Sequence, residues 1–218
     1  MHRPFLISRF VLMTGSLLVV LALLISAIQP YDRVTWWMEV FPVVIIFPLL
    51  WLTRRSFTWT GLLYGLITLH ALVLILGGAY SYARVPLGFW LQETFELSRN
   101  PYDKIGHFMQ GLVPALAARE LMLRLNWVNG HRAAGFFSIC VAMTVSAMYE
   151  LIEWLAAVLL GQGADEFLGT QGYVWDTQSD MAFALLGALS AALLLSRWHD
   201  QQIRQMDGWS KNLFYPNK

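Results

Sequence analysis

The sequence has little charge: Asp, Glu, Lys and Arg make up only 13% of its 218 residues, whereas 57% are hydrophobic. Soluble domains usually carry about 25% charged residues, and so apolar a chain would expose large hydrophobic patches to water. The net charge is +1 and no basic run occurs, so nothing indicates a nucleic-acid partner. The composition therefore indicates an integral membrane protein.

Cysteine and compact catalytic motifs are also scarce. The single cysteine, Cys140, excludes a disulfide framework within the chain and is expected to be a small packing residue. The sequence contains no His-Glu-x-x-His metal motif, no P-loop and no phosphatase-type signature. Any chemical site must therefore be assembled from separate segments.

Long apolar stretches are what the chain has instead. A helix needs roughly 20 mainly apolar residues to cross a bilayer, and these runs are continuous rather than alternating, which favours helices over strands. We predict an all-α, polytopic protein, a single transmembrane helical bundle over residues 1–218. The expected spans are residues 10–28, 34–53, 57–80, 105–125, 133–160 and 181–198. The fourth span is the least apolar, because it contains His107, Arg119 and Glu120.

The distribution of positive charge predicts the orientation of the bundle. With the N-terminus inside, eleven of the 15 Lys and Arg residues fall on the cytoplasmic side. The others lie on the outer side: Arg33, Arg84, Arg99 and Lys104. The positive-inside rule then favours both termini in the cytoplasm. Tryptophans near the span ends are typical of interfacial belts, with Trp36, Trp37, Trp90 and Trp175 outside and Trp127 and Trp198 inside.

This orientation gathers ionisable side chains of several helices beneath the outer surface. Such groups are costly in hydrocarbon, normally face the bundle interior and often mark a function. Their spacings place neighbours on one helix face: Asp103 with His107, Glu150 with Glu153, and Asp176 with Asp180. The sequence therefore predicts a polar pocket open to the outside, to which Glu39 and His70 on other helices contribute.

Most of these residues also have a purely structural interpretation. His70 fits a hydrogen-bonded core histidine, and Glu39 fits an interfacial residue near two tryptophans. Asp103 and Asp176 could simply cap the helices that they precede. Glu150 is harder to explain in this way, because a carboxylate two turns below the surface needs a partner, a proton or a metal ion.

Three motifs carry a resemblance to a known family. Residues 102–108 read Tyr-Asp-Lys-Ile-Gly-His-Phe, residues 149–154 read Tyr-Glu-Leu-Ile-Glu-Trp, and residues 175–181 read Trp-Asp-Thr-Gln-Ser-Asp-Met. On these motifs the chain resembles the YjdF-type bacterial inner-membrane proteins over essentially its whole length. The resemblance implies a multi-pass inner-membrane location and topology, and it implies no reaction.

Residues 100–196 resemble, more distantly, the VanZ-like membrane proteins. Those proteins open one helix with Asp-Lys-x-x-His-Phe, carry a glutamate on the next and open the last with an aspartate. The matching positions here are Asp103, Lys104, His107 and Phe108, then Glu150, then Asp180. The glutamine and arginine that usually follow the glutamate are absent, and Glu153 and Trp154 lie nearby instead. This resemblance implies a link to the cell envelope and glycopeptide resistance.

Three functions are compatible with the pattern. The interpretation that we favour is a non-catalytic binding or accessory membrane protein with a polar cluster at the outer leaflet. The alternatives are a membrane-embedded, metal-dependent enzyme acting on a lipid or cell-envelope precursor, and a proton-coupled small transporter. The sequence shows no ionisable residue deep in the cytoplasmic half, which weighs against a transporter.

The enzyme hypothesis assigns roles to individual side chains. A glutamate beside a histidine suits proton transfer, so Glu150 and His107 are the expected catalytic acid and base. One histidine with several carboxylates favours a hard or borderline divalent metal ion as cofactor. The expected ligands are Asp103, His107, Glu150 and Asp180, and the expected substrate contacts are Glu153, Asp176 and Gln178. Membrane lipids are the expected partners, and the sequence names no protein partner.

Overall fold

The computed structural model describes residues 3–160 and 173–214, and every regular element in these residues is helical. The all-α prediction is therefore confirmed. The long helices are α1 (Arg3–Ser26), α2 (Arg33–Thr53), α3 (Gly61–Tyr80), α5 (Tyr102–Arg124), α6 (His131–Leu160), α8 (Asp176–Ser190) and α9 (Ser196–Phe214). Shorter elements are η1 (Tyr82–Arg84), α4 (Pro86–Thr94) and the π-helical turn η2 (Ala191–Leu195).

Three of the predicted spans have different starting points in the structure. α1 begins at Arg3 rather than at residue 10. α3 begins at Gly61 rather than at residue 57, because Thr60 caps it and accepts a hydrogen bond from the backbone N–H of Leu63. α8 begins at Asp176 rather than at residue 181, and the helical chain continues through η2 into α9. Hydropathy placed the boundary too late there, since Asp176 and Asp180 are charged yet buried.

Five helical stretches of the described chain are long and apolar enough to cross a bilayer: α1, α2, α3, α6 and the stretch from Asp176 to Met206. α5 has 23 residues but is not among them, because it carries several charged side chains. Those side chains point into the protein, and Asp103, Lys104, Arg119 and Glu120 are all buried. α5 is thus a central helix whose polar groups are shielded by its neighbours.

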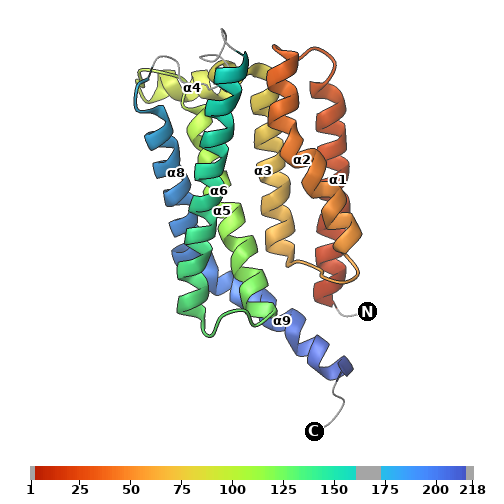
Figure 1. Ribbon diagram of the computed structural model, residues 1–218. Coiled ribbons are helices and arrows are strands. Elements are labelled where there is room, and N and C mark those ends of the chain that lie inside the picture. Colours follow the sequence, from red (N-terminus) through yellow and green to blue (C-terminus); the bar gives the residue numbers. More distant parts are fainter. Residues whose placement is uncertain (1–2, 161–172, 215–218) are drawn as a thin grey trace.

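The long helices form two groups that meet along α3 and α5 (Figure 1). α1 and α2 pack against α3, whereas α6 and α8 pack against α5. The start of α1 and the whole of α9 lie at the same end of the bundle, and the short α4 lies across the other end. α2 and α6 flank one face of the molecule from opposite sides.

α5 and α8 approach each other backbone to backbone, and glycines make this approach possible. A Cβ atom at Gly111 would lie 1.7 Å from the carbonyl oxygen of Ala184. A Cβ atom at Gly187 would lie 2.0 Å from the carbonyl oxygen of Phe108. Small residues allow helices in membrane proteins to pack backbone against backbone in this way. The contact brings the start of α8 alongside the first turns of α5.

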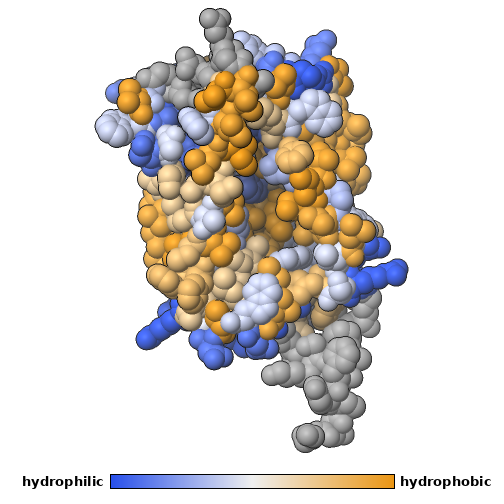
Figure 2. Space-filling model, in the orientation of Figure 1, coloured by the Kyte–Doolittle hydropathy of each residue, from blue (hydrophilic) through white to orange (hydrophobic). Residues whose placement is uncertain are grey.

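The surface agrees with a membrane environment. Hydrophobic residues cover the middle of the bundle, and hydrophilic residues gather at its two ends (Figure 2). Five of the six predicted belt tryptophans are more than half exposed: Trp37, Trp90, Trp127, Trp175 and Trp198. The assignment of Trp36 to the belt is wrong, because its ring is 5% exposed and its Nε1–H donates to Ser26 Oγ at 3.0 Å.

Candidate functional site

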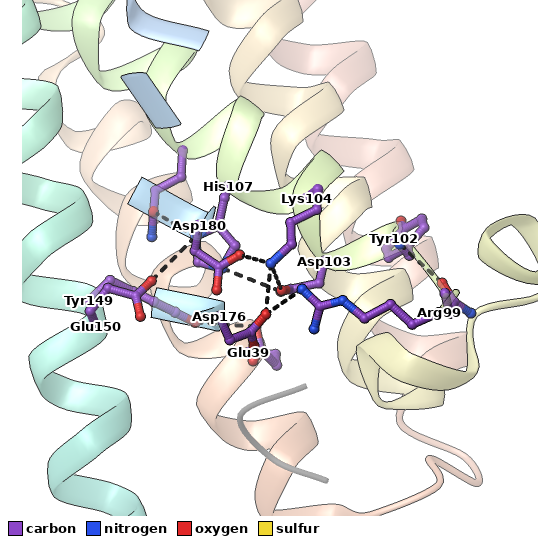
Figure 3. Close-up of polar contacts among 12 residues, drawn as sticks. Glu39, Arg99, Tyr102, Asp103, Lys104, His107, Tyr149, Glu150, Asp176 and Asp180 are labelled. Atoms are coloured by element: carbon purple, nitrogen blue, oxygen red, sulfur yellow. Dashed lines mark hydrogen bonds and ion pairs between the residues drawn. The ribbon is translucent and has the colours of Figure 1, made fainter. Parts of the chain in front are cut away.

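A cluster of charged side chains lies at the end of the bundle where α5 and α8 begin (Figure 3). We call it the polar cluster and define it as Arg99, Asp103, Lys104, His107, Glu150, Asp176 and Asp180. Apart from Arg99, every member is at most 8% exposed. Three separate parts of the chain therefore contribute buried charge to one place.

Lys104 is the centre of the ion pairs. Its Nζ lies 2.8 Å from Asp176 Oδ1 and 3.4 Å from Asp103 Oδ2, and it also bonds Asp180 Oδ1. Arg99, which precedes α5, bonds Asp176 Oδ1 at 2.5 Å. Two cations thus connect the beginning of α5 to the beginning of α8. The i,i+4 spacing of Asp176 and Asp180 explains how one ammonium group contacts both.

His107 connects this network to α6. Its Nε2 lies 3.3 Å from Asp103 Oδ1 and 3.7 Å from Asp180 Oδ1. Its Nδ1 lies 3.1 Å from Gln110 Oε1 and 3.7 Å from Glu150 Oε1. Both ring nitrogens therefore face oxygen atoms, as a metal ligand or a proton-transfer group requires.

Beside the polar cluster, Tyr149 joins the two groups of helices. Its hydroxyl group, on α6, donates to Glu39 Oε2 on α2 at 3.2 Å. Tyr82, in η1, lies nearby and is held against the chain by close contacts with Gly77 and Gly106. Burial raises the pKa of the Tyr82 hydroxyl well above its usual range, so that this group stays protonated at neutral pH.

An elongated cavity of about 420 Å³ runs between α2, α3, α5 and α6. The polar side chains that line it are Glu39, His70, Tyr82, Asp103, His107, Gln110, Tyr149 and Glu153. Most of the remaining lining is apolar and includes Val43, Phe47, Ile67, Val113, Ala117 and Val145. The face between α2 and α6 is hollowed, with hydrophilic atoms deep inside it (Figure 2).

The structure brings together most of the residues predicted for the site. Asp103, His107, Glu150, Asp176 and Asp180 all belong to the polar cluster. Glu153 is half-buried and lines the cavity. Gln178 is exposed on α8 and, among the described residues, is not part of the cavity lining.

Several of the structural interpretations are wrong. Glu39 is 2% exposed and lines the cavity, so it is not an interfacial residue. His70 is no hydrogen-bonded core histidine, because its Nε2 is buried without a hydrogen-bond partner. Asp103 and Asp176 are not caps, since the N-cap positions of α5 and α8 are Pro101 and Trp175 and neither helix has a side-chain cap.

Sequence reasoning missed the central roles of Lys104 and Arg99, which it used as outer-side charges for the orientation and, for Lys104, as one position of the VanZ-like pattern. The available signal was local: Lys104 lies between Asp103 and His107, where a lysine facing the same interior must neutralise carboxylates. Arg99 carried no such signal, since its partner Asp176 is 77 residues away in the chain.

Buried ionisable residues also gather at the other end of the bundle, where sequence analysis predicted no site. At the other end of α5, Glu120 and His199 are both 0% exposed, and His199 Nε2 lies 2.9 Å from Glu120 Oε2. Glu120 also accepts hydrogen bonds from Thr60 and from Arg124 Nη1. His199 escaped attention because it lies beyond the predicted last span, on α9, which turns back under the bundle.

Comparisons with known proteins agree with the resemblance drawn from the motifs. The chain is 55% identical to "Inner membrane protein YjdF" of Escherichia coli (strain K12) over 195 residues, which cover 89% of this chain and 93% of the relative. No solved structure matches it. Residues 11–201 match the family model described as "Predicted membrane protein (DUF2238)". The chain therefore belongs to the DUF2238 family of predicted membrane proteins.

Proposed function

We propose that this protein binds an amphiphilic molecule of the bilayer, with the polar part against the acidic and imidazole side chains and the apolar part in the cavity. The observation that carries the proposal is the two-part lining of the 420 Å³ cavity. Ligand pockets of about 300–1,000 Å³ are typically apolar with a few convergent polar groups. A purely structural polar network would need no adjoining apolar cavity.

The shape of the bundle supports entry from the side. α2 packs against α3 and α6 packs against α5 and α8, so the two helices that flank the hollowed face belong to different groups. Tyr149 and Glu39 bridge them at the polar end of the cavity. A molecule already dissolved in the bilayer can reach the apolar lining between α2 and α6 without crossing water.

The topology that goes with this function has six spans, with α5 as the sixth, in one bundle. α3 ends at one end of the bundle and α6 begins at the other, and α5 makes the traverse between them (Figure 1). An even number of spans puts both termini on one side, and the positive-inside rule favours the cytoplasm. The relative's name supports an inner-membrane location, which leaves the polar cluster beneath the outer surface.

The alternatives receive less support. A transporter needs a polar path between the two ends, but the described cavity between them is lined by apolar residues such as Val43, Phe47 and Val113. The acid–base roles of Glu150 and His107, substrate contacts through Glu153, Asp176 and Gln178, and the more distant VanZ-like resemblance stay predictions. An enzyme acting on the bound amphiphile would use the same site.

The proposal is tested by filling the cavity. Val145 lines the cavity, whereas Val158, on the same helix, is 61% exposed on the outside of the bundle and absent from the described lining. Wild type, Val145→Trp and Val158→Trp are purified in a mild detergent, and bound lipid is measured by native mass spectrometry and by extraction. We expect a retained amphiphile in wild type and Val158→Trp and its loss in Val145→Trp. Equal lipid content in all three proteins would contradict the proposal.

A further inference from the structure

Within the polar cluster, three ligand atoms have the spacing of a metal site. Asp103 Oδ1, His107 Nε2 and Asp180 Oδ1 belong to buried residues, and the three residues can offer one ligand atom each within 4.8 Å of one another. His107 Nε2 lies 3.3 Å from Asp103 Oδ1 and 3.7 Å from Asp180 Oδ1. Ligands at 2.0–2.1 Å from a tetrahedral ion are separated by roughly 3.4 Å, which these distances approach without rearrangement.

The charge of the polar cluster leaves room for a further cation. Its four carboxylates outnumber its two cationic side chains, Lys104 and Arg99. Buried carboxylates are tolerated only when they are paired, protonated or bound to a metal ion. The ion pairs with Lys104 and Arg99 are concentrated on Asp176 and Asp180, which leaves Glu150 on the far side of His107.

Glu150 supplies an observation that is independent of the ion pairs. Its side chain is 7% exposed and points toward the cluster from α6 (Figure 3). Its Oε1 is buried without a hydrogen-bond partner. The nearest imidazole nitrogen, His107 Nδ1, is 3.7 Å away and is already 3.1 Å from Gln110 Oε1. The cluster thus contains a buried carboxylate oxygen that no hydrogen bond satisfies, on the Nδ1 side of the imidazole whose Nε2 faces Asp103 and Asp180.

We propose that Asp103, His107 and Asp180 bind a divalent metal ion through His107 Nε2, with the Lys104 ammonium group as the competing cation. Lys104 shares Asp180 Oδ1 and the Asp103 carboxylate with the ion, so the two cations exclude each other. One imidazole nitrogen with carboxylate oxygens suits Zn²⁺ or Mn²⁺ better than Ca²⁺, which takes six to eight oxygen ligands. Ion binding at these residues does not require an amphiphile in the cavity.

Competition between the two cations gives a sharp test. Removing the ammonium group while keeping the length of the side chain, in Lys104→Met, should free the carboxylates for the ion. Binding of Zn²⁺ and of Mn²⁺ to the purified, full-length protein is measured by titration calorimetry and by elemental analysis after desalting. We expect Lys104→Met to bind at least about tenfold more tightly than wild type, and Asp180→Asn to bind at least about tenfold more weakly.

A matched control uses a carboxylate at the opposite end of the bundle. Asp200 pairs with Arg119 at 2.5 Å, and Asp200→Asn should leave the ion affinity unchanged. Equal affinities for wild type and Lys104→Met, or wild-type affinity in Asp180→Asn, would overturn the proposal. A loss of ion binding in Asp200→Asn, or no binding by either wild type or Lys104→Met, would overturn it as well. Should Lys104→Met not fold, Lys104→Gln replaces it in the same comparison.

Discussion

Replacing Gly111 with alanine adds one methyl group at a backbone contact between α5 and α8. The new Cβ would lie 1.7 Å from the carbonyl oxygen of Ala184 and 2.5 Å from its carbonyl carbon. Ordinary contact between such atoms needs about 3.5 Å, so the helices would have to separate by roughly 2 Å. Both obstacles are backbone atoms within a helix, so no side-chain rotation can relieve the clash.

The size of the effect follows from two opposing contributions. Overpacking costs about 1–3 kcal/mol and occasionally more, and a backbone obstacle places this case at the upper end. Alanine gains about 1 kcal/mol over glycine in helix propensity. We therefore expect Gly111→Ala to lower the free energy of unfolding by about 2 kcal/mol.

Gly135, on α6, provides the matched control, because a Cβ atom there would meet nothing within 4 Å. Gly135→Ala should gain helix propensity without any clash, and it should therefore raise the free energy of unfolding by about 1 kcal/mol. The two variants should then differ by about 3 kcal/mol, or roughly 6–12 °C in melting temperature. The assay is thermal unfolding in detergent followed by tryptophan fluorescence. Equal melting temperatures for the two variants would refute the claim that α5 and α8 are in backbone contact.

Three further predictions concern the rest of the molecule. His199→Ala should cost about 1–3 kcal/mol, because the buried Glu120 carboxylate loses one hydrogen-bond partner and keeps Arg124 and Thr60; unchanged unfolding in denaturant would contradict the pairing. Asp32, the N-cap of α2, accepts a hydrogen bond from the backbone N–H of Thr35, and this bond lowers the pKa of its carboxyl group. The cap therefore stabilises the folded protein at a pH above the pKa of Asp32 in the unfolded chain, and this stabilisation is lost as the pH falls through the folded-state pKa. Asp32→Ala should therefore cost about 1 kcal/mol at pH 7 and less at pH 3, in unfolding measured at both pH values. A reporter enzyme that is active only in the cytoplasm should be active when it is fused after Lys218. Activity of a reporter that works only outside the cytoplasm would show the opposite orientation.

Much of the fold was readable because hydrophobicity acts locally along the chain. A run of apolar residues must be a helix when bilayer surrounds it, which is why the predicted ends of α2, α5 and α6 fall within three residues of the observed ones. The same reasoning failed at the start of α8, where Asp176 and Asp180 are buried by partners on α5. Hydropathy counts a charged side chain as exposed and has no way to include a distant partner.

The sequence predicted only those parts of the candidate site that depend on residues close together in the chain. Spacing of three or four residues along one helix showed that Asp103 and His107 share a face, and the structure confirms it. Spacing could not show that the Glu39 side chain meets Tyr149, 110 residues further along the chain. Nor could it reveal the cavity, whose walls come from four helices.

The sequence by itself determined that this protein lies in a membrane, that its spans are helical and that they contain charged residues that are costly in hydrocarbon. Each of these properties depends on composition or on residues within a few helical turns of one another. Only the tertiary structure decided which charges meet, since pairing depends on helix packing. The glycine contact between α5 and α8 brings Asp180 to Lys104 and His107, and it thereby turns separate carboxylates into one site.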